Sequence, residues 1–259
     1  MAGRGAPSNP RPTRTGSLDR EPDGDWLDTA ELIDDAPMPL RTTVTVEHPK
    51  TIIARNTSPD IGFDRSINPY RGCEHGCIYC YARPTHAFHD LSPGLDFESR
   101  LFAKPDAAKL LRAELAKRGY TPAPLAIGTN TDGYQPIERE WGITRSVIEV
   151  LAETRHPLLI TTKSDRLLRD IDLLAAMARD NLVGVAISVT TLDPALTRTL
   201  EPRAPHPKRR LAAIRQLINA GVPTQVNISP IIPAITDHEI EAIMAAAAQA
   251  GAIRASYIL

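Results

Sequence analysis

Residues 67–84 read I-N-P-Y-R-G-C-E-H-G-C-I-Y-C-Y-A-R-P and contain the three cysteines of the sequence, Cys73, Cys77 and Cys80. Three residues separate the first pair and two separate the second, which leaves no fourth cysteine as a ligand or disulfide partner. Three thiolates in one loop suit an iron–sulfur cluster that keeps one iron open, whereas a closed four-thiolate site needs another cysteine. The loop therefore predicts a metal centre at which a cofactor or substrate can bind.

Two other interpretations of the loop stay open at this point. Clustered cysteines inside a cell are more often metal ligands than disulfides. A zinc site could be completed by His75, His86 or His89. The cysteines could also be free buried thiols.

Around this loop, short apolar runs alternate with amphipathic segments. Strands are predicted at 42–55 (two short ones), 66–71, 124–128, 158–162, 182–189, 224–229 and 253–259. Helices are predicted at 106–118, 143–154, 166–179, 207–220 and 237–250. Asp193 and Pro194 predict the start of a further short helix, and Thr236 with Glu239 predicts a capping box. Six strand–helix units predict an α/β fold with a parallel sheet and right-handed crossovers.

Polar residues follow the predicted strands at their carboxyl ends, where such sheets bind ligands. They are the cysteine loop, G-T-N-T-D at 128–132, T-K-S at 162–164, Ser188, and Asn227 with Ser229. Their shared position predicts one pocket. Ser188 and Asn227 could instead satisfy backbone groups, and Lys163 could be a solvated strand-end lysine. Asp132, Gln135 and Glu138 are either substrate-side residues or turn and helix-start residues.

Composition limits the class of protein. The chain has 259 residues, with 30 Lys and Arg against 31 Asp and Glu, and lacks the basic excess of proteins that coat nucleic acid. Basic residues 208–210 are expected on a solvated helix face. No apolar run approaches the ~20 residues of a membrane span, and no secretory signal is recognisable, so we expect a cytoplasmic protein. Residues 1–41 are expected to be a disordered tail, and 42–259 one core domain whose C-terminal end is missing a covering segment.

The cysteine loop resembles that of radical S-adenosylmethionine (radical SAM) enzymes, whose motif is C-x3-C-x-aromatic-C, with Tyr79 in the aromatic position. Within that superfamily it is most similar to the branch related to spore photoproduct lyase, often labelled DNA repair photolyase-like. Further similar strings are N-T-S-P-D-I-G-F-D (56–64), G-T-N-T-D-G-Y-Q-P-I-E (128–138), T-T-K-S (161–164) and E-P-R-A-P (201–205). The resemblance covers most of residues 50–259 and implies a partial (βα)6 barrel of the TIM type.

The resemblance also implies the chemistry. Cys73, Cys77 and Cys80 would hold a [4Fe-4S] cluster whose open iron binds the amino and carboxylate groups of S-adenosylmethionine (SAM). One electron from a flavodoxin- or ferredoxin-type reductant would cleave SAM to methionine and a 5′-deoxyadenosyl radical, which abstracts hydrogen from the substrate. Tyr79 would lie near the adenine, Lys163 would meet the methionine carboxylate, and Ser188 the ribose or methionine. Residues expected to complete the SAM site are Thr129, Thr131 and Asn227.

One departure from the branch limits what the resemblance implies about the substrate. Spore photoproduct lyase uses a cysteine outside the cluster as a hydrogen-atom donor, and this sequence has none to offer. We therefore expect no repair of spore photoproduct by the cysteine-dependent route. The substrate is left open: nucleic acid, or a peptide or small metabolite, with a structural zinc protein as the alternative outside the superfamily.

Overall fold

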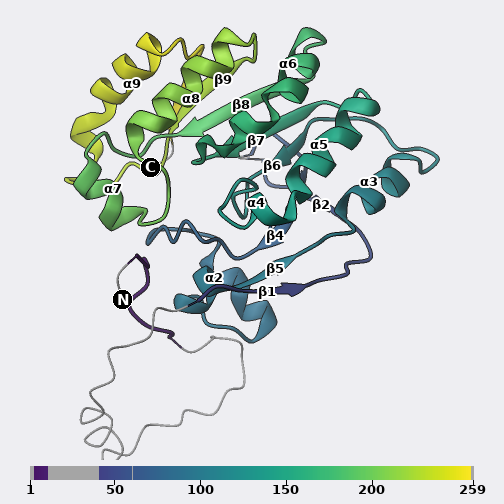
Figure 1. The fold of residues 1–259 in the computed structure, drawn as a ribbon, viewed down its shortest axis with the longest axis horizontal. Helices are drawn as coiled ribbons and strands as arrows, with labels where there is room; N and C mark the ends of the chain where they lie inside the picture. The colour runs from purple at the N-terminus through teal and green to yellow at the C-terminus, as the bar shows by residue number, and fades with distance from the viewer. Residues whose placement is uncertain (1–2, 11–40, 60, 258–259) are drawn as a thin grey trace, which may run out of the picture.

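The computed structural model describes residues 3–10, 41–59 and 61–257 (Figure 1). Its strands are β1 Thr43–Val46, β2 Ile53–Arg55, β3 Arg65–Ile67, β4 Tyr70–Arg71, β5 Arg100–Ala103, β6 Leu125–Ile127, β7 Leu158–Thr162, β8 Val183–Ser188, β9 Thr224–Ile228 and β10 Ala255–Tyr257. Its α-helices are α2 Leu95–Ser99, α3 Ala107–Leu115, α4 Glu138–Trp141, α5 Ile143–Glu153, α6 Ile171–Arg179, α7 Pro194–Leu200, α8 Pro207–Asn219 and α9 Ile240–Gln249. The 3₁₀ helices are η2 Arg83–His89, η3 Asp165–Asp170 and η4 Asp237–Glu239.

The larger sheet has seven strands in the order β10-β9-β8-β7-β6-β3-β2. Six of them, β3 and β6 to β10, are parallel to their neighbours, and β2 is antiparallel to β3 at the edge. Chain order and spatial order agree along these six strands, as successive right-handed crossovers require. The predicted α/β fold with a partial barrel of parallel strands is thus confirmed.

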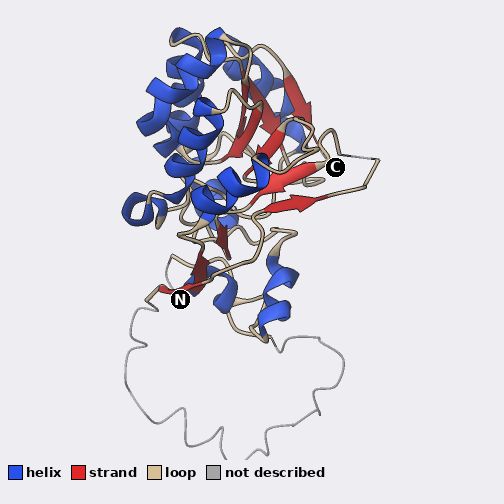
Figure 2. Cartoon of the chain, turned by 90° about the vertical axis from the view of Figure 1, so that its right-hand side faces the viewer, coloured by secondary structure: helices blue, strands red, loops and turns tan. Residues whose placement is uncertain are grey.

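Most helices lie on one side of this sheet (Figure 2). The alternation of side chains along β8 explains the arrangement, because Val183, Val185 and Ile187 all point to one face and are buried. The opposite face is more open, since Leu159 on β7 is 38 % exposed. The helices therefore bury one face of the sheet, and the carboxyl ends of its strands carry the polar loops predicted to form a site.

A second, three-stranded sheet has the order β1-β5-β4, with β1 parallel and β4 antiparallel to β5. The strand expected at 66–71 divides into β3 and β4, which belong to different sheets. Pro69 lies between them and has no N–H to donate to a continuous ladder. Its carbonyl instead accepts from Lys104 N (3.0 Å), just after β5. This division turns the chain into the cysteine loop.

Helix starts show one correct and one wrong local prediction. Asp193 accepts from Ala195 N at 2.7 Å and caps α7 as expected. The capping box at Thr236 and Glu239 is absent, because the Glu239 carboxylate accepts from Thr191 Oγ1 and from Leu192 N (2.7 Å). This carboxylate therefore holds the segment after β8 to the end of η4, and the helix begins as a 3₁₀ turn.

The predicted disordered tail, residues 1–41, lies mostly outside the described residues. Residues 3–10 are described, and they pack against the segment that follows the cysteine loop. Gly5 N and Ala6 N donate to the Glu98 carboxylate at 2.9 and 2.8 Å, and Arg4 donates to Glu98 O at 2.6 Å. Glu98 is fully buried, so its carboxylate requires such donors. Within the described chain, no helix is long and apolar enough to cross a membrane.

Candidate functional site

The cysteine loop leaves β4 through two tight backbone positions. Gly72 and Gly76 have φ values of 72° and 67°, which side chains disfavour. A Cβ on Gly72 would lie 2.7 Å from Phe97 O, and one on Gly76 would lie 2.7 Å from Glu98 Oε2. The two glycines allow the loop to fold closely onto α2. The three cysteines are free thiols; Cys73 and Cys77 are buried, and Cys80 is partly buried.

Neighbouring segments fix the loop around each cysteine. Gln135 accepts from Glu74 N (2.9 Å) and donates to Gly72 O (3.0 Å), so one side chain holds both residues that flank Cys73. Gln135 itself is fully buried. Ile78 N donates to Leu200 O at 3.0 Å, just after Cys77. The loop therefore has its shape set by the β6 loop and α7, which come much later in the sequence.

The three cysteines line a cleft of about 100 Å³ together with the carboxyl ends of β6, β7 and β8. Its other lining residues are His75, Tyr81, Gly128, Thr129, Asn130, Thr131, Asp132, Thr161, Thr162, Lys163 and Ser188. Four of the residues predicted from the sequence, Thr129, Thr131, Lys163 and Ser188, are thus gathered beside the cysteines. Asn227 and Tyr79 are not among the lining residues.

Three cysteine ligands of a cubane cluster surround a volume, because each binds a different iron. Within the described ranges, no three Cys, His, Asp or Glu side chains converge as the ligands of a single ion would. Burial raises the pKa of the Cys77 thiol to about 12 and that of Cys73 well above its ordinary value. These thiols are therefore protonated at neutral pH until a metal displaces the protons. The loop fits a cluster on one side of the cleft.

Tyr79 is held behind the cleft by a buried carboxylate. Its hydroxyl donates to Glu201 and lies 3.2 Å from Thr190 Oγ1. Arg210 donates to the same Glu201 carboxylate and to Ser188 O (3.1 Å). Lys163 Nζ is 3.9 Å from Glu201 Oε1 and 5.7 Å from the Tyr79 ring centre. Glu201 thus connects the aromatic residue of the cysteine loop with the lysine after β7.

The charges of this group are mutually stabilising. Burial alone would raise the pKa of Glu201, but the charges of Arg210 and Lys163 lower it to about 2. Burial and the Glu201 charge raise the pKa of Tyr79 well above its ordinary value, so it stays a neutral donor. Burial lowers the pKa of Lys163, but the thiolate form of Cys77 and the carboxylate of Glu201 outweigh burial and raise it; at neutral pH, where Cys77 is a thiol, Glu201 is the negative charge beside the lysine. Lys163 therefore presents a positive charge at the cleft.

The prediction for Arg210 was wrong, and Glu201 was missed. Arg210 was expected on a solvated face, yet Arg210 and Glu201 are each only 1 % exposed and form an ion pair. Glu201 begins the segment E-P-R-A-P (201–205), and the sequence around it does not indicate its role. The sequence did contain one sign of this pair: the acidic Glu201 precedes α8, and Arg210 lies in the first turn of that helix. Arg209, beside Arg210, is exposed and pairs with Asp165 as a surface residue does.

Asp132 organises the loops after β6 and β7. Its carboxylate accepts from Thr162 Oγ1 (2.7 Å), Lys163 N (2.8 Å) and Tyr134 N (2.9 Å). His75 Nδ1 of the cysteine loop lies 3.4 Å from the same carboxylate. Although burial acts in the opposite direction, His75 and these donors lower the pKa of Asp132 to about 2. Asp132 is therefore an ionised turn residue that connects three loops.

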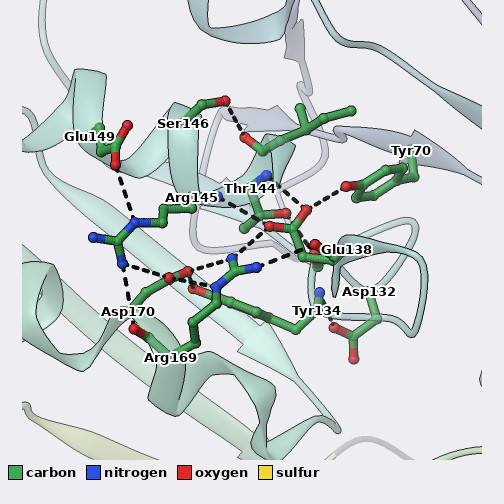
Figure 3. A network of polar contacts seen from close by, with 12 residues as sticks. Tyr70, Asp132, Tyr134, Glu138, Thr144, Arg145, Ser146, Glu149, Arg169 and Asp170 are labelled. Carbon is green, nitrogen blue, oxygen red and sulfur yellow. Dashed lines mark hydrogen bonds and ion pairs between the residues drawn. The ribbon is translucent and has the colours of Figure 1, made fainter. Parts of the chain in front are cut away.

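A second buried network lies beneath the same loop (Figure 3). Glu138 accepts from Tyr70 OH, Thr144 N (3.0 Å) and Arg169 Nη2 (2.7 Å). Asp170 accepts from Tyr134 OH at 3.0 Å and pairs with Arg145 at 2.9 Å. Of the two hypotheses for Asp132, Gln135 and Glu138, these contacts favour the one in which they are turn and helix-start residues. They position the strand ends that form the cleft.

Asn227 lies on β9 with its side chain engaged elsewhere. Its Oδ1 accepts from Ser229 Oγ (3.0 Å) and Ser256 Oγ (3.3 Å). The structure thus gives this residue local partners at the β9–β10 edge and does not bring it to the cysteines.

The model of the radical SAM superfamily matches residues 67–247. The chain belongs to the radical SAM superfamily. The matched region includes the cysteine loop, the strand ends around the cleft and Glu201. It therefore agrees with the site that the geometry delimits.

Relatives and solved structures agree with this membership. An uncharacterized protein of Mycobacterium tuberculosis strain H37Rv is 39 % identical over 192 residues, covering 73 % of this chain and 56 % of the relative. One from Methanocaldococcus jannaschii is 30 % identical and covers 67 % of this chain and 62 % of the relative. The chain spans little more than half the length of such relatives. A spore photoproduct lyase variant has a TM-score of 0.59 at 17 % identity, covering 80 % of this chain and 57 % of that one. Spore photoproduct lyase with a dinucleoside spore photoproduct gives 0.54 at 19 %, covering 73 % and 52 %. This likeness shows a shared fold.

Proposed function

We propose that this chain is the core of a radical SAM enzyme in which Cys73, Cys77 and Cys80 hold a [4Fe-4S] cluster and the adjoining cleft binds SAM. The observation that carries the proposal is the cleft itself, which the three cysteines share with the polar ends of three neighbouring strands. When bound and reduced, such a cluster would supply the one electron needed for reductive cleavage of SAM.

The residues of the chain bind and orient the cofactor. The ammonium of Lys163 would attract the methionine carboxylate, because it lines the cleft and its charge is sustained by Glu201. Thr129, Thr131 and Ser188 would contact the rest of SAM through hydroxyl or backbone groups. Tyr79 does not line the cleft and supports it from behind by a hydrogen bond to Glu201. Asn227 is left out of the proposed site, since its amide oxygen has local partners.

A one-electron reductant of the flavodoxin or ferredoxin type is the partner that this chemistry requires. For the substrate we propose no single chemical class. The similarity to spore photoproduct lyase is one of fold, so nucleic acids, peptides and small metabolites are all substrate classes to be tested.

The test is anaerobic reconstitution followed by metal analysis and visible spectroscopy. We expect about four irons and four sulfides per chain, a broad iron–sulfur absorbance, and formation of 5′-deoxyadenosine from SAM after reduction. One zinc per chain with no iron-dependent absorbance would instead support a structural zinc protein. A loaded, reduced cluster that neither binds nor cleaves SAM would also contradict the proposal.

Lys163→Ala separates cofactor binding from cluster binding. We expect weaker SAM binding with unchanged iron content, because the ammonium lines the cleft but is not a cluster ligand. The matched control is Lys109→Ala, which removes an exposed lysine of α3. Loss of iron in Lys163→Ala would show that the lysine is structural.

A further inference from the structure

A second cavity adjoins the cysteine cleft, and Thr131 is the one residue of the proposed cofactor site that also lines it. It encloses about 210 Å³ between the small sheet, the edge of the large sheet and the β6 loop. Its lining residues are Pro49, Thr51, Ile52, Ile53, Ala54, Asn68, Tyr70, Arg71, Thr85, Lys104, Asn130 and Thr131. Two of these residues are basic and none is acidic.

Lys104 is the central charge of this cavity. Its side chain is buried, with the residue only 7 % exposed, and its ammonium donates to Asn68 O at 2.9 Å. An ammonium has three protons to donate, so two remain for another acceptor once this bond is made. A buried cation is costly without a partner, and an anion in the cavity would supply one.

The groups that face Lys104 come from three elements. Arg71 on β4 lines the cavity and pairs with Glu47, which follows β1, at 2.7 and 2.9 Å. His89 of η2 lies close enough for its charge to interact with Lys104. Burial and the charge of Arg71 lower the pKa of Lys104 to about 8, against the opposing effect of Glu47. With two cations and one carboxylate, and His89 neutral, the group carries one net positive charge.

The cavity and the cleft share a wall. Asn130 and Thr131 line both, and the same two residues are anchored to the segment that enters the cysteine loop. Asn130 N donates to Asn68 Oδ1 (3.2 Å), and Thr131 Oγ1 donates to Tyr70 O (3.1 Å). A molecule bound by Lys104 therefore lies directly across the β6 loop from the place proposed for SAM.

We propose that the Lys104 cavity is an oxyanion subsite that receives a phosphate group of the substrate. The assignment to substrate rests on the proposed function, whereas oxyanion binding by Lys104 does not. The substrate class is then a phosphorylated molecule, and its phosphate supplies the charge that Lys104 lacks. Two sources share this chemistry, a phosphomonoester on a small metabolite and a phosphodiester of nucleic acid.

The experiment is calorimetric titration of the anaerobic, cluster-loaded protein with sulfate at constant ionic strength. Sulfate is a suitable probe because its charge does not change near neutral pH. We expect saturable binding with a dissociation constant on the order of 1 mM, weakened about tenfold or more by Lys104→Met. The control, Lys109→Met on the exposed face of α3, should bind sulfate as the unmodified protein does.

A second variant guards against misfolding of Lys104→Met. Thr51 is exposed at the rim of the cavity, so Thr51→Asp places a negative charge there without opening the core. It should weaken sulfate binding while leaving the melting temperature unchanged. Sulfate binding of the unmodified protein should also fall as pH rises through about 8, where Lys104 loses its proton. Binding that is absent, or equal in all these variants, overturns the subsite.

Competition identifies the source of the phosphate. Glycerol 3-phosphate represents a phosphomonoester and a thymidine dinucleotide represents a phosphodiester; displacement of sulfate by one supports that source. Displacement by neither overturns the assignment to substrate. SAM cleavage is measured on the same samples, so a cluster-loaded protein that binds sulfate through Lys104 but neither binds nor cleaves SAM refutes the proposed function and leaves the subsite intact.

Discussion

Glu201→Gln is the substitution that most directly tests the charged group behind the cleft. The change keeps the shape of the side chain and removes its charge. Arg210, which is 1 % exposed, would then face a neutral amide in place of a carboxylate. Lys163 would lose the same counter-charge from a greater distance, 3.9 Å. We expect a large loss of stability centred on this group.

The pKa of Glu201 falls from 4.5 to about 2 in the folded protein. At about 1.4 kcal/mol per pKa unit, the ionised carboxylate contributes about 3 kcal/mol to the free energy of unfolding at neutral pH. Removing one partner from a buried ion pair costs about 3–5 kcal/mol by comparison with other proteins. For a chain of this size, a loss in this range lowers the melting temperature by roughly 10 °C.

The assay is thermal unfolding of the anaerobic, cluster-loaded protein at neutral pH, followed by circular dichroism. Glu241→Gln on the exposed surface of α9 is the matched control and should leave the melting temperature unchanged. The double variant Glu201→Met with Arg210→Met should recover part of the loss, since no buried arginine is then left unpaired, although Lys163 still lacks its counter-charge. A loss of under about 1 kcal/mol in Glu201→Gln, or no recovery in the double variant, would refute the reasoning.

Glu201 and Asp132 both have pKa values of about 2 in the folded protein, below their ordinary values of 4.5 and 3.8. Their contribution to stability is therefore complete above about pH 5 and is lost as the pH falls toward 2. Acid titration followed by circular dichroism should show unfolding between these pH values, and unfolding that began above pH 5 would contradict the prediction. Gln135→Ala should speed the loss of iron to a chelator, because the clamp on both sides of Cys73 is removed, whereas an unchanged rate would show that the loop holds its own shape. Glu138→Ala should lower the free energy of unfolding by about 3 kcal/mol or more in thermal melts at unchanged iron stoichiometry, and a near-neutral effect would mean that the network of Figure 3 contributes little.

The sequence predicts the large sheet well because its signal is local. The run at 158–162 matches β7 residue for residue, and the run at 182–189 contains β8. Each is a short apolar segment between a helix end and a polar loop, and neither needs information from elsewhere in the chain. The polar strand ends were predicted to share a pocket for the same reason, since parallel strands bring their carboxyl ends to one edge. Thr129, Thr131, Lys163 and Ser188 accordingly lie in one cleft.

The small sheet is a different case, because its strands are defined by their partners. β5 reads R-L-F-A and β4 only Y-R, which are too short to show a period of two. β4 pairs with β5 because the strand is interrupted at Pro69 and because the chain returns beside β4 after the cysteine loop. The same sheet forms one side of the Lys104 cavity, so the cavity could not be predicted from the sequence.

Carboxylate partners show the same limit most clearly. Glu239 has the spacing of a capping box with Thr236, yet it accepts from Thr191 and Leu192, 48 and 47 residues earlier. The sequence pattern predicts that the basic residues near Glu201 are solvated, yet Glu201 forms a buried ion pair with Arg210 and accepts a hydrogen bond from Tyr79. A local sequence pattern indicates only the partners that are near in the sequence. In the folded chain a carboxylate pairs with buried donors in preference to exposed ones, because a buried donor cannot hydrogen-bond to water instead. The residues that line the cleft can therefore be read from strand ends, while those that hold its charges in place become visible only once the strands are assembled.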